Sequence, residues 1–347
     1  MIQGIRFSLA MLAVVVGTLL TIVILGRFER PPVTGVQAGY RGTAMQEVYN
    51  PRFMAALRAA NVVPASLPAL PAAGPKAGEV YHNVQVLGSL SVGQFTRLMA
   101  SITQWVAPTQ GCAYCHDVKN MASDKLYTKV VARRMIQMVR TINGDWKQHV
   151  GATGVVCYTC HRGQPVPSQI WFKDPGPKHA GGITEAAMPM GHPAGSVGDT
   201  ALPYDPFSAF LDRADDIRVQ SKVALPGTDR QDIRDTEWTY ALMMYFSQSL
   251  GVNCTYCHNS RSFGDWSQST PQRVTAWYGI RMVRALNHDY LEPLGDVFPP
   301  LRHGPLGDVP KLACATCHQG VNKPLLGVSM LAGFPELAGT TTPAAAK

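Results

Sequence analysis

One five-residue pattern, Cys-x-x-Cys-His, occurs four times in this chain. Together the copies use all eight cysteines, which are Cys112, Cys115, Cys157, Cys160, Cys254, Cys257, Cys314 and Cys317. The pattern is typical of a c-type haem site, in which both cysteines bond to the porphyrin and the histidine ligates its iron. We therefore expect four covalently attached haems. Their first iron ligands would be His116, His161, His258 and His318.

Other uses of paired cysteines fit the pattern less well. A thioredoxin-like dithiol does not need a histidine after its second cysteine. A structural zinc site needs two such pairs close together, whereas these pairs are separated by tens of residues. Disulfides within such short loops would not staple a fold of this size. The pattern thus favours haem attachment over a dithiol, a zinc site or a disulfide framework.

The formal net charge of +8 resembles that of a protein that binds nucleic acid or an anionic membrane. Haem propionates are negatively charged, so the haem-loaded protein should be closer to neutral and many lysines and arginines should be propionate partners. We therefore expect no nucleic-acid partner. The 26 prolines and 32 glycines suit a loop-rich chain moulded around cofactors.

The N-terminal region contains an uncharged apolar run from Phe7 to Gly26. A helix of about 20 such residues can cross the hydrocarbon core of a bilayer. A cleaved signal peptide would have a shorter apolar region and a small-residue cleavage site, and here Arg27 follows without one. We predict that residues 1–30 are a retained, single-pass anchor in the inner membrane. Because c-type haems are attached outside the cytoplasm, the bulk of the chain should face the periplasm.

The rest of the chain divides into five regions. Residues 31–88 are rich in Pro, Ala and Gly and should form either an extended wrap over a surface or a disordered tether. Residues 89–165 and 233–322 each hold two motifs and are the predicted first and second dihaem halves. Residues 166–232 form a Pro- and Gly-rich connector, and residues 323–347 form a C-terminal tail.

The two halves are an internal repeat of helix, haem loop, helix and haem loop. Residues 136–140 match residues 280–284, and residues 159–163 match residues 316–320. In the first half, Ser91 can cap a helix over residues 92–105. The predicted fold is mainly α with extensive loops. It is a multihaem cytochrome c with two dihaem halves related by a pseudo-twofold axis, plus the N-terminal transmembrane helix.

The repeat also bears on the sixth ligand of each iron. Methionine thioethers suit electron-transfer haems, and Met99 and Met243 occupy matching places before the first and third motifs. In the later helix Met135 corresponds to Gly279, so a ligand at Met135 for the second haem would have no counterpart for the fourth. Spacing does not choose among the histidines that could replace it. These are His149, His288 and His303.

Two cations lie at matching places near the starts of the later helices. Arg273 falls in the first turn of a helix that Thr270 and Pro271 should begin, where a positive charge opposes the helix dipole. Lys129 is its counterpart in the first half. We expect both side chains to pair with haem propionates.

From about residue 27 to its C-terminus, the chain resembles the tetrahaem cytochrome subunit of purple-bacterial photosynthetic reaction centres. The segments that carry the resemblance are 131–135, 241–244, 269–273, 277–284 and 317–321, together with His149 shortly before Cys157. Known members carry a lipid-bearing cysteine at the mature N-terminus, where this chain has Arg27. The apolar helix would replace that lipid.

The resemblance implies a ligand set and a function. Met99 would serve the haem of His116, Met135 that of His161 and Met243 that of His258, while His149 would complete the haem of His318. The chain would be an electron-transfer subunit, not an enzyme, that re-reduces the photo-oxidised bacteriochlorophyll pair. Its partners would be the reaction-centre membrane subunits and a soluble donor, either a small cytochrome c or a high-potential iron–sulfur protein.

The resemblance also implies a roughly linear haem stack, with the haem of His258 nearest the membrane partner and that of His116 near the far end. Two other functions stay open. A multihaem reductase would need an iron with an open sixth position. A membrane-anchored electron conduit on the quinol side would work without photochemistry.

Overall fold

The computed structural model describes residues 2–27, 33–37, 46–175, 202–203, 205–219 and 233–339. The described chain is mainly helical, with long loops. Its α-helices are α1 (Ile2–Arg27), α2 (Pro51–Ala60), α3 (Ala77–Val80), α4 (Val92–Val106), α5 (Tyr127–Asp145), α6 (Lys147–Val150), α7 (Cys157–His161), α8 (Ile233–Leu250), α9 (Pro271–Leu286) and α10 (Cys314–His318). This confirms the predicted helical class. Of the predicted connector only a part is described, and residues 340–347 lie outside the described residues.

Strands are few and short in the described chain. Strand β1 (Thr34–Gln37) pairs antiparallel with β2 (Gln46–Tyr49), with Thr34 opposite Tyr49. Strand β3 (Ile170–Trp171) pairs antiparallel with β4 (Lys311–Leu312), with Ile170 opposite Leu312. The second pair joins a segment that follows the second motif to one that precedes the fourth.

Short 3-10 and π turns fill much of the remainder. They are η1 (Gly111–Tyr114), η3 (Ser208–Asp212), η4 (Cys254–Tyr256), η5 (Asn287–Leu291), η6 (Glu292–Leu294), η7 (Pro300–Arg302), η8 (Pro324–Gly327), η9 (Leu331–Gly333) and η10 (Pro335–Leu337). Such turns close on local hydrogen bonds, so they do not depend on a continuous apolar stripe.

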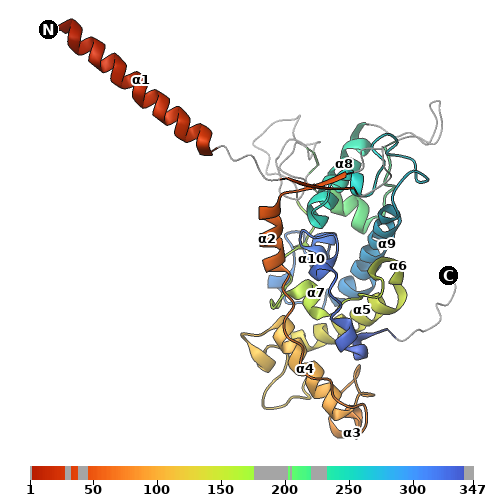
Figure 1. Ribbon diagram of the computed structural model, residues 1–347. Coiled ribbons are helices and arrows are strands. Elements are labelled where there is room, and N and C mark those ends of the chain that lie inside the picture. The colour runs from red at the N-terminus through yellow and green to blue at the C-terminus, as the bar shows by residue number, and fades with distance from the viewer. Residues whose placement is uncertain are drawn as a thin grey trace.

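Helix α1 is the predicted apolar helix. It is long and apolar enough to cross a membrane, and none of its apolar window is buried in the body of the protein. Figure 1 shows it extending away from the body. A helix that is apolar on all sides and packs against nothing suits a lipid environment better than a protein core.

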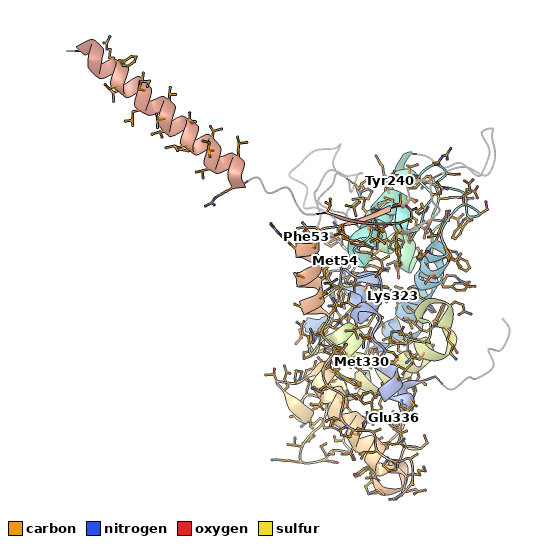
Figure 2. The ribbon with its side chains drawn as sticks, viewed as in Figure 1. Phe53, Met54, Tyr240, Lys323, Met330 and Glu336 are labelled. Carbon is orange, nitrogen blue, oxygen red and sulfur yellow. A yellow bond between two sulfur atoms is a disulfide. The ribbon has the colours of Figure 1, made fainter. Side chains whose placement is uncertain are left out.

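The described part of the predicted extended segment runs over the surface of the body. Figure 1 shows α2 in orange along one side, and Figure 2 shows Phe53 and Met54 on that helix. Hydrogen bonds hold the segment at intervals. They join Glu47 to Asn253, Asn61 to Arg162, Val62 to Tyr158, Leu67 to Arg97 and Pro71 to Ser91. One stretch of chain therefore touches the surroundings of the second and third motifs and the helix before the first.

The body is elongated, and its helices follow one another along its length. Helix α4 contacts α7, α7 contacts α10, and α10 contacts α8. Figure 1 shows these four helices in that order from one end to the other. Turn η1 lies beside α4, and η4 lies beside β2. The spatial order of the motifs is therefore first, second, fourth and third.

Helix α4 begins where the sequence predicts. The Ser91 hydroxyl accepts from the backbone N–H of Gln94, and the Gln94 side chain accepts from the N–H of Ser91. This capping box satisfies two donors that the helix start would otherwise leave open. The observed end at Val106 lies one residue beyond the predicted end.

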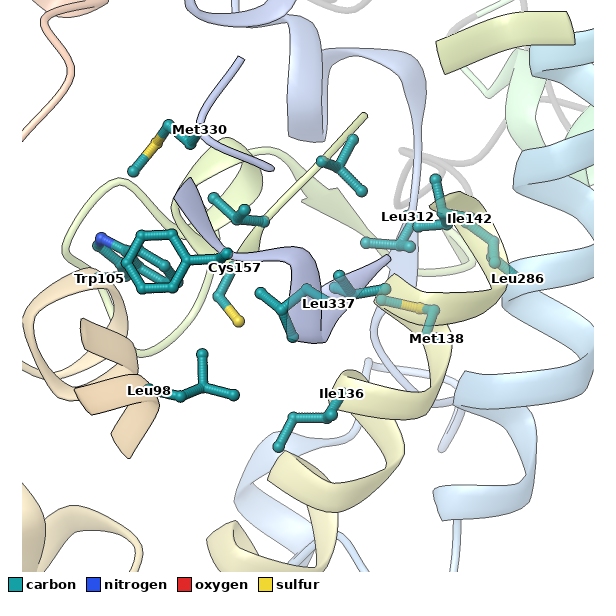
Figure 3. Packing of buried hydrophobic residues seen from close by; sticks show 14 of the residues in the cluster. Leu98, Trp105, Ile136, Met138, Ile142, Cys157, Leu286, Leu312, Met330 and Leu337 are labelled. Carbon is teal, nitrogen blue, oxygen red and sulfur yellow. The ribbon is translucent and has the colours of Figure 1, made fainter. Parts of the chain in front are cut away.

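The larger hydrophobic core, seen in Figure 3, joins α4 and α5 to the C-terminal segment. The ring of Phe334 meets that of Trp105 edge to face, with centroids 4.6 Å apart. Arg97 and Glu336 form a buried ion pair beside them. Figure 2 shows Glu336 toward the α4 end of the body. The described part of the predicted tail is therefore packed into the core of the first half.

Candidate haem sites

The four motifs fall into two structural classes. The motifs at 112–116 and 254–258, called the outer motifs below, begin in 3-10 turns, and their first cysteines are exposed. The motifs at 157–161 and 314–318, called the inner motifs, are the short helices α7 and α10. In the inner motifs Cys157 and His318 are buried. The same five-residue pattern thus occurs in two environments.

In all four motifs the histidine is fixed in the same way. Each Nδ1 donates a hydrogen bond to a backbone carbonyl. The pairs are His116 with Met121 at 3.1 Å, His161 with Gln164 at 2.9 Å, His258 with Phe263 at 2.9 Å and His318 with Val321 at 3.0 Å. A metal-ligating histidine typically makes this contact, which sets the tautomer and leaves Nε2 for the metal.

The inner motifs also end alike. Arg162 and Gln319, each directly after its histidine, both have left-handed backbone, with φ of 52° and 49°. The next N–H then returns to the first long helix of its own half. Gly163 donates to Trp105 of α4 at 2.8 Å, and Gly320 donates to Ser249 of α8 at 2.9 Å. These contacts repeat between the halves residue by residue.

The two inner motifs touch each other. Cys160 and Cys317 are joined by a disulfide, with their Cα atoms 4.4 Å apart. The exclusion of disulfides on sequence grounds is wrong for this pair, because that argument considered bonds within a motif and not between motifs that pack together. A cysteine sulfur that forms a disulfide cannot also form a thioether bond to haem. Haem attachment at both inner motifs therefore requires Cys160 and Cys317 as free thiols.

A cavity of about 780 Å³ lies between the inner motifs and the helices around them. Apolar residues of α5 and α9 line it, including Val131, Ile136 and Val283. It is also lined by Met135, His149, Cys157, Cys160, His161, Cys314, Cys317 and His318, and by Cys115 and Cys257 of the outer motifs. An apolar cavity of this size that carries thiols, imidazoles and a thioether on its walls fits a porphyrin with an iron centre.

His149 lies opposite His318 in this cavity. Their ring centroids are 5.9 Å apart, with an angle of 64° between the ring planes. His149 Nδ1 donates to the carbonyl of Thr275 at 2.9 Å, so its Nε2 is also left for a ligand. Metal–imidazole bonds are about 2 Å long, and two such bonds plus the ring radii give a separation of this size. The pair therefore suits one metal ion between two imidazoles.

The other two histidine candidates are placed differently. His288 is exposed, and its Nδ1 pairs with Asp289 at 2.8 Å. His303 also lines the cavity, but it directs Nε2 rather than Nδ1 to a carbonyl, that of Gly295, at 3.1 Å. Of the three candidates that spacing left open, His149 has the geometry of the motif histidines.

Burial keeps these imidazoles neutral. Burial, with a smaller contribution from the neighbouring His149 ring, lowers the pKa of His318 to about 4. Burial also lowers the pKa of His149 and of His161. Neutral imidazole is the form that binds a metal. Burial raises the pKa of Cys157 and of Cys314 to about 12, which favours thiols over the thiolates that a zinc site needs.

The methionine candidates divide between the cavity and the cores. Met135 lines the cavity together with His161. Met99 and Met243 are half-buried against the first and second core clusters and do not line it. Both lie on the helix that precedes an outer motif, Met99 on α4 and Met243 on α8.

The two predicted propionate partners differ in their surroundings. Lys129 Nζ donates to the carbonyls of Met121 and Ser123 and forms an ion pair with Asp124 at 3.2 Å. The Arg273 guanidinium lies 3.9 Å from the centroid of the Trp266 ring. Within the described part of the chain, Arg273 has no ion pair.

Two functional features were not predicted from the sequence. Thr275 acts through its backbone carbonyl, which leaves no signal in the residue type. Arg162 has a buried Nη1 with no hydrogen-bond partner among the described residues. A buried donor on a cation is costly unless an anion meets it, so Arg162 suits a propionate. The position of Arg162 directly after His161 could have suggested this role from the sequence. The matching position in the fourth motif is the uncharged Gln319, so the repeat did not support it.

Comparison with known proteins agrees with this picture. The family described as "Photosynthetic reaction centre cytochrome C subunit" matches residues 29–338. The reaction center cytochrome c subunit of Thermochromatium tepidum is 53% identical over 314 residues, which cover 90% of this chain and 77% of the relative. That of Rubrivivax gelatinosus is 52% identical over 325 residues, covering 93% and 88%. That of Roseobacter denitrificans is 44% identical over 326 residues, covering 89% and 86%. The chain therefore belongs to the photosynthetic reaction centre cytochrome c subunit family.

Proposed function

We propose that this chain carries four covalently attached haems and re-reduces the photo-oxidised bacteriochlorophyll pair of a photosynthetic reaction centre. The observation that carries the proposal is the row of four histidines, each fixed through Nδ1, on helices and turns that contact one another along an elongated body. Bound haem supplies one-electron redox chemistry. The chain itself sets the spacing, the ligands and the burial of each iron. No side chain makes or breaks a substrate bond, so the chain is not an enzyme.

The proposed ligand set is the one that the family resemblance implies. The histidines of the motifs are the first ligands, and Met99, Met135, Met243 and His149 are the second ligands of the haems of His116, His161, His258 and His318. The facing rings of His149 and His318 support the fourth assignment. The place of Met135 in the cavity supports the second.

The two halves are pseudo-twofold-related dihaem units. Matching turns and hydrogen bonds after His161 and His318 support this relation. So do the hydrogen bonds from Thr128 to the carbonyl of Tyr114 and from Thr270 to that of Tyr256, each of which ties a helix start to the outer motif of its half. Lys129 and Arg273, which follow these threonines, are the proposed propionate partners.

Helix α1 is a retained anchor in the inner membrane, and the body lies on the periplasmic side. The short link between Arg27 and Thr34 reaches at most about 25 Å. Strand β1 pairs with β2, and Glu47 of β2 accepts from the N–H of Asn253 beside the third motif at 2.9 Å. The third motif would thus be tethered near the membrane and would pass electrons to the reaction-centre membrane subunits.

The first motif lies at the opposite end of the body and is the entry point for electrons. Its first cysteine is exposed, and Val118 and Met121 beside it are exposed as well. The donor is a soluble periplasmic protein, either a small cytochrome c or a high-potential iron–sulfur protein. Electrons would then travel through the first, second, fourth and third haems in spatial order.

Flash spectroscopy on intact membranes tests the function. A short flash should oxidise the bacteriochlorophyll pair and then, as the pair recovers, the haems of this chain. Membranes that hold this chain but no reaction centre are the control, and their haems should stay reduced. Haems that stay reduced while the pair recovers in complete membranes would overturn the proposal. A reductase would reveal itself by rapid carbon monoxide binding to a reduced, open iron.

A further inference from the structure

Gly279 of α9 lies directly against the ring of His149. A Cβ atom built on Gly279 would be 2.5 Å from His149 Cε1 and 2.7 Å from its Nδ1. Real Cβ atoms do not come this close to other atoms, so any side chain here would force the ring or the helix to move. Gly279 is buried and has ordinary helical backbone, so its lack of a side chain, not its flexibility, is what the position uses.

Thr275 supplies the second contact from one turn earlier on the same helix. Its carbonyl accepts the hydrogen bond from His149 Nδ1 at 2.9 Å. Positions four residues apart lie on one face of a helix, so both contacts reach the ring from one side of α9. The carbonyl fixes the tautomer, and the gap at Gly279 fixes how near the ring approaches. Nε2 is left directed away from the carbonyl, and His318 lies against the ring.

We propose that residues 275–279 of α9 form a seat that positions His149 as the second ligand of the fourth haem. The seat, meaning the Thr275 carbonyl and the open space at Gly279, lies in the second half, whereas His149 lies on α6 after the first half's long helix. Helices α6 and α9 contact each other. Ligation of the fourth haem therefore depends on correct packing between the halves. This inference rests on the proposed function.

The two halves of the internal repeat differ at the position of the seat. In the first half the corresponding residue is Met135, which lines the same cavity and carries a thioether. In the second half that place is Gly279, and the space left by the missing side chain admits a ligand from the other half. The residue at this one position of the repeat thus decides whether the helix supplies a ligand itself or leaves space for a ligand from the other half. Gly279 and Thr275 are positioning residues, because neither would touch the iron.

The test compares Gly279→Ala with Gly93→Ala in the complete, haem-loaded complex. Both glycines are helical, and a Cβ at Gly93 would meet Leu70 only at 3.5 Å, an ordinary contact. The readouts are the near-infrared charge-transfer band that distinguishes His/His from His/Met haem, and carbon monoxide binding by the reduced protein. Gly279→Ala should lose the His/His band and gain carbon monoxide binding at one haem in four. Gly93→Ala should match the wild type. A Gly279→Ala protein with the wild-type band and no carbon monoxide binding would overturn the proposal.

Imidazole rescue separates the seat from a general packing role. His149→Gly should regain the His/His band when free imidazole is added, because the small ligand can occupy the seat. The double variant His149→Gly/Gly279→Ala should not regain it, because the new methyl group fills that space. Equal rescue of the two proteins would contradict the seat.

Accumulation provides a further check. If the Gly279→Ala protein does not accumulate, the proposal predicts that His149→Gly/Gly279→Ala accumulates, because that double variant lacks the clashing ring. Failure of both proteins would mean that Gly279 serves another packing role and would overturn the proposal. Flash-induced haem oxidation in the same membranes reports on the electron-donor function independently. Silent haems together with the predicted ligation changes would reject that function and leave the seat standing.

Discussion

The outer and inner motifs share one five-residue pattern but occupy different places in the molecule. The outer motifs begin in the 3-10 turns η1 and η4, beside α4 and β2, and their histidines bond to carbonyls five residues ahead. The inner motifs contact each other and bond to carbonyls three residues ahead. Both inner histidines line the cavity, whereas the outer motifs reach it only through Tyr114, Cys115, Tyr256 and Cys257. The pattern itself therefore predicts haem attachment, and the surroundings of each motif determine how deeply it is buried.

The largest expected difference between the two classes is in folding. An unfilled cavity costs about 24 cal/mol per Å³, so leaving half of the ≈ 780 Å³ cavity empty would cost about 9 kcal/mol. That is comparable to the whole stability of a typical domain. Cys314, Cys317 and His318 of the fourth motif line this cavity, whereas the first motif reaches it only through Tyr114 and Cys115. Cys314→Ala/Cys317→Ala should therefore lower accumulation of the protein at least several-fold. Cys112→Ala/Cys115→Ala should accumulate with one haem fewer.

Immunoblots of membranes and the intact mass of the purified chain measure both outcomes. Equal accumulation of the two double variants would mean that the inner haems are no more structural than the outer ones. The mass of the wild-type chain also reports the haem count and whether α1 is retained.

The next effect is on the midpoint potential of the fourth haem. Replacing a histidine ligand by methionine raises a haem potential, and axial ligands span about 0.8 V across haem proteins. His149→Met should raise one of the four midpoints by on the order of 100 mV. His303→Met, in the same cavity, should leave all four unchanged. A redox titration checks both variants, and an unchanged set of midpoints in His149→Met would reject the assignment.

A smaller effect distinguishes the two outer motifs. Burial raises the pKa of Cys257 and lowers that of His258. The charge of Arg273 opposes the rise at Cys257 and adds to the fall at His258, so it reaches the third motif. Lys129 is instead directed to Asp124 and to two carbonyls of its own loop. Arg273→Gln should lower the midpoint of the third haem by roughly 30 mV, which is less than the 59 mV that corresponds to about 1.4 kcal/mol for one electron. Lys129→Gln should shift the first haem less. A redox titration in which Lys129→Gln shifts a midpoint potential more than Arg273→Gln does would contradict this explanation of the difference between the two cations.

The smallest effect is on acid stability. Hydrogen bonds from Arg133, with further ones from Asn83 and Lys129, hold the pKa of Asp124 well below its usual range. A carboxyl whose folded pKa is depressed stabilises the fold above the unfolded value, about 3.9, and that contribution is lost as the pH falls below it. Asp124 is 38% exposed, so the effect should stay below about 1 kcal/mol.

Asp124→Asn should therefore be less stable than the wild type at pH 7 and should lose less stability between pH 5 and pH 2. Asp265→Asn, in the loop of the third motif, is the matched control. Asp265 is half-buried, and its carboxylate accepts hydrogen bonds from Ser267 and Gln268, which are uncharged. Denaturation curves at several pH values test the ranking. A larger effect of Asp265→Asn would contradict it.

Much of the local structure could be predicted from residue types, because it depends on near neighbours. Ser91 and Gln94 make a capping box, and α4 begins where they predict. The apolar run gave α1, and the repeat separated Met135 from Gly279. These signals lie within a few residues of the feature that they specify.

Other features depend on which distant segments pack together. Cys160 and Cys317 are 157 residues apart in the chain, yet their motifs touch. Spacing could not choose His149 over His288 and His303, and only the family resemblance implied it. The carbonyl contact that supports it comes from Thr275 in the other half. The burial of Phe334 against Trp105 could not be predicted either, because the segment that carries it has no helical or strand periodicity.

Counting the haem types in the purified protein tests whether His149 and His318 ligate one iron. Low-temperature electron paramagnetic resonance, with near-infrared spectra of the oxidised complex, should give three His/Met haems and one His/His haem. The His149→Met variant should give four His/Met haems. Four haems of one type in the wild type, or a His/His signal that survives in His149→Met, would contradict a fourth haem held between His318 and His149.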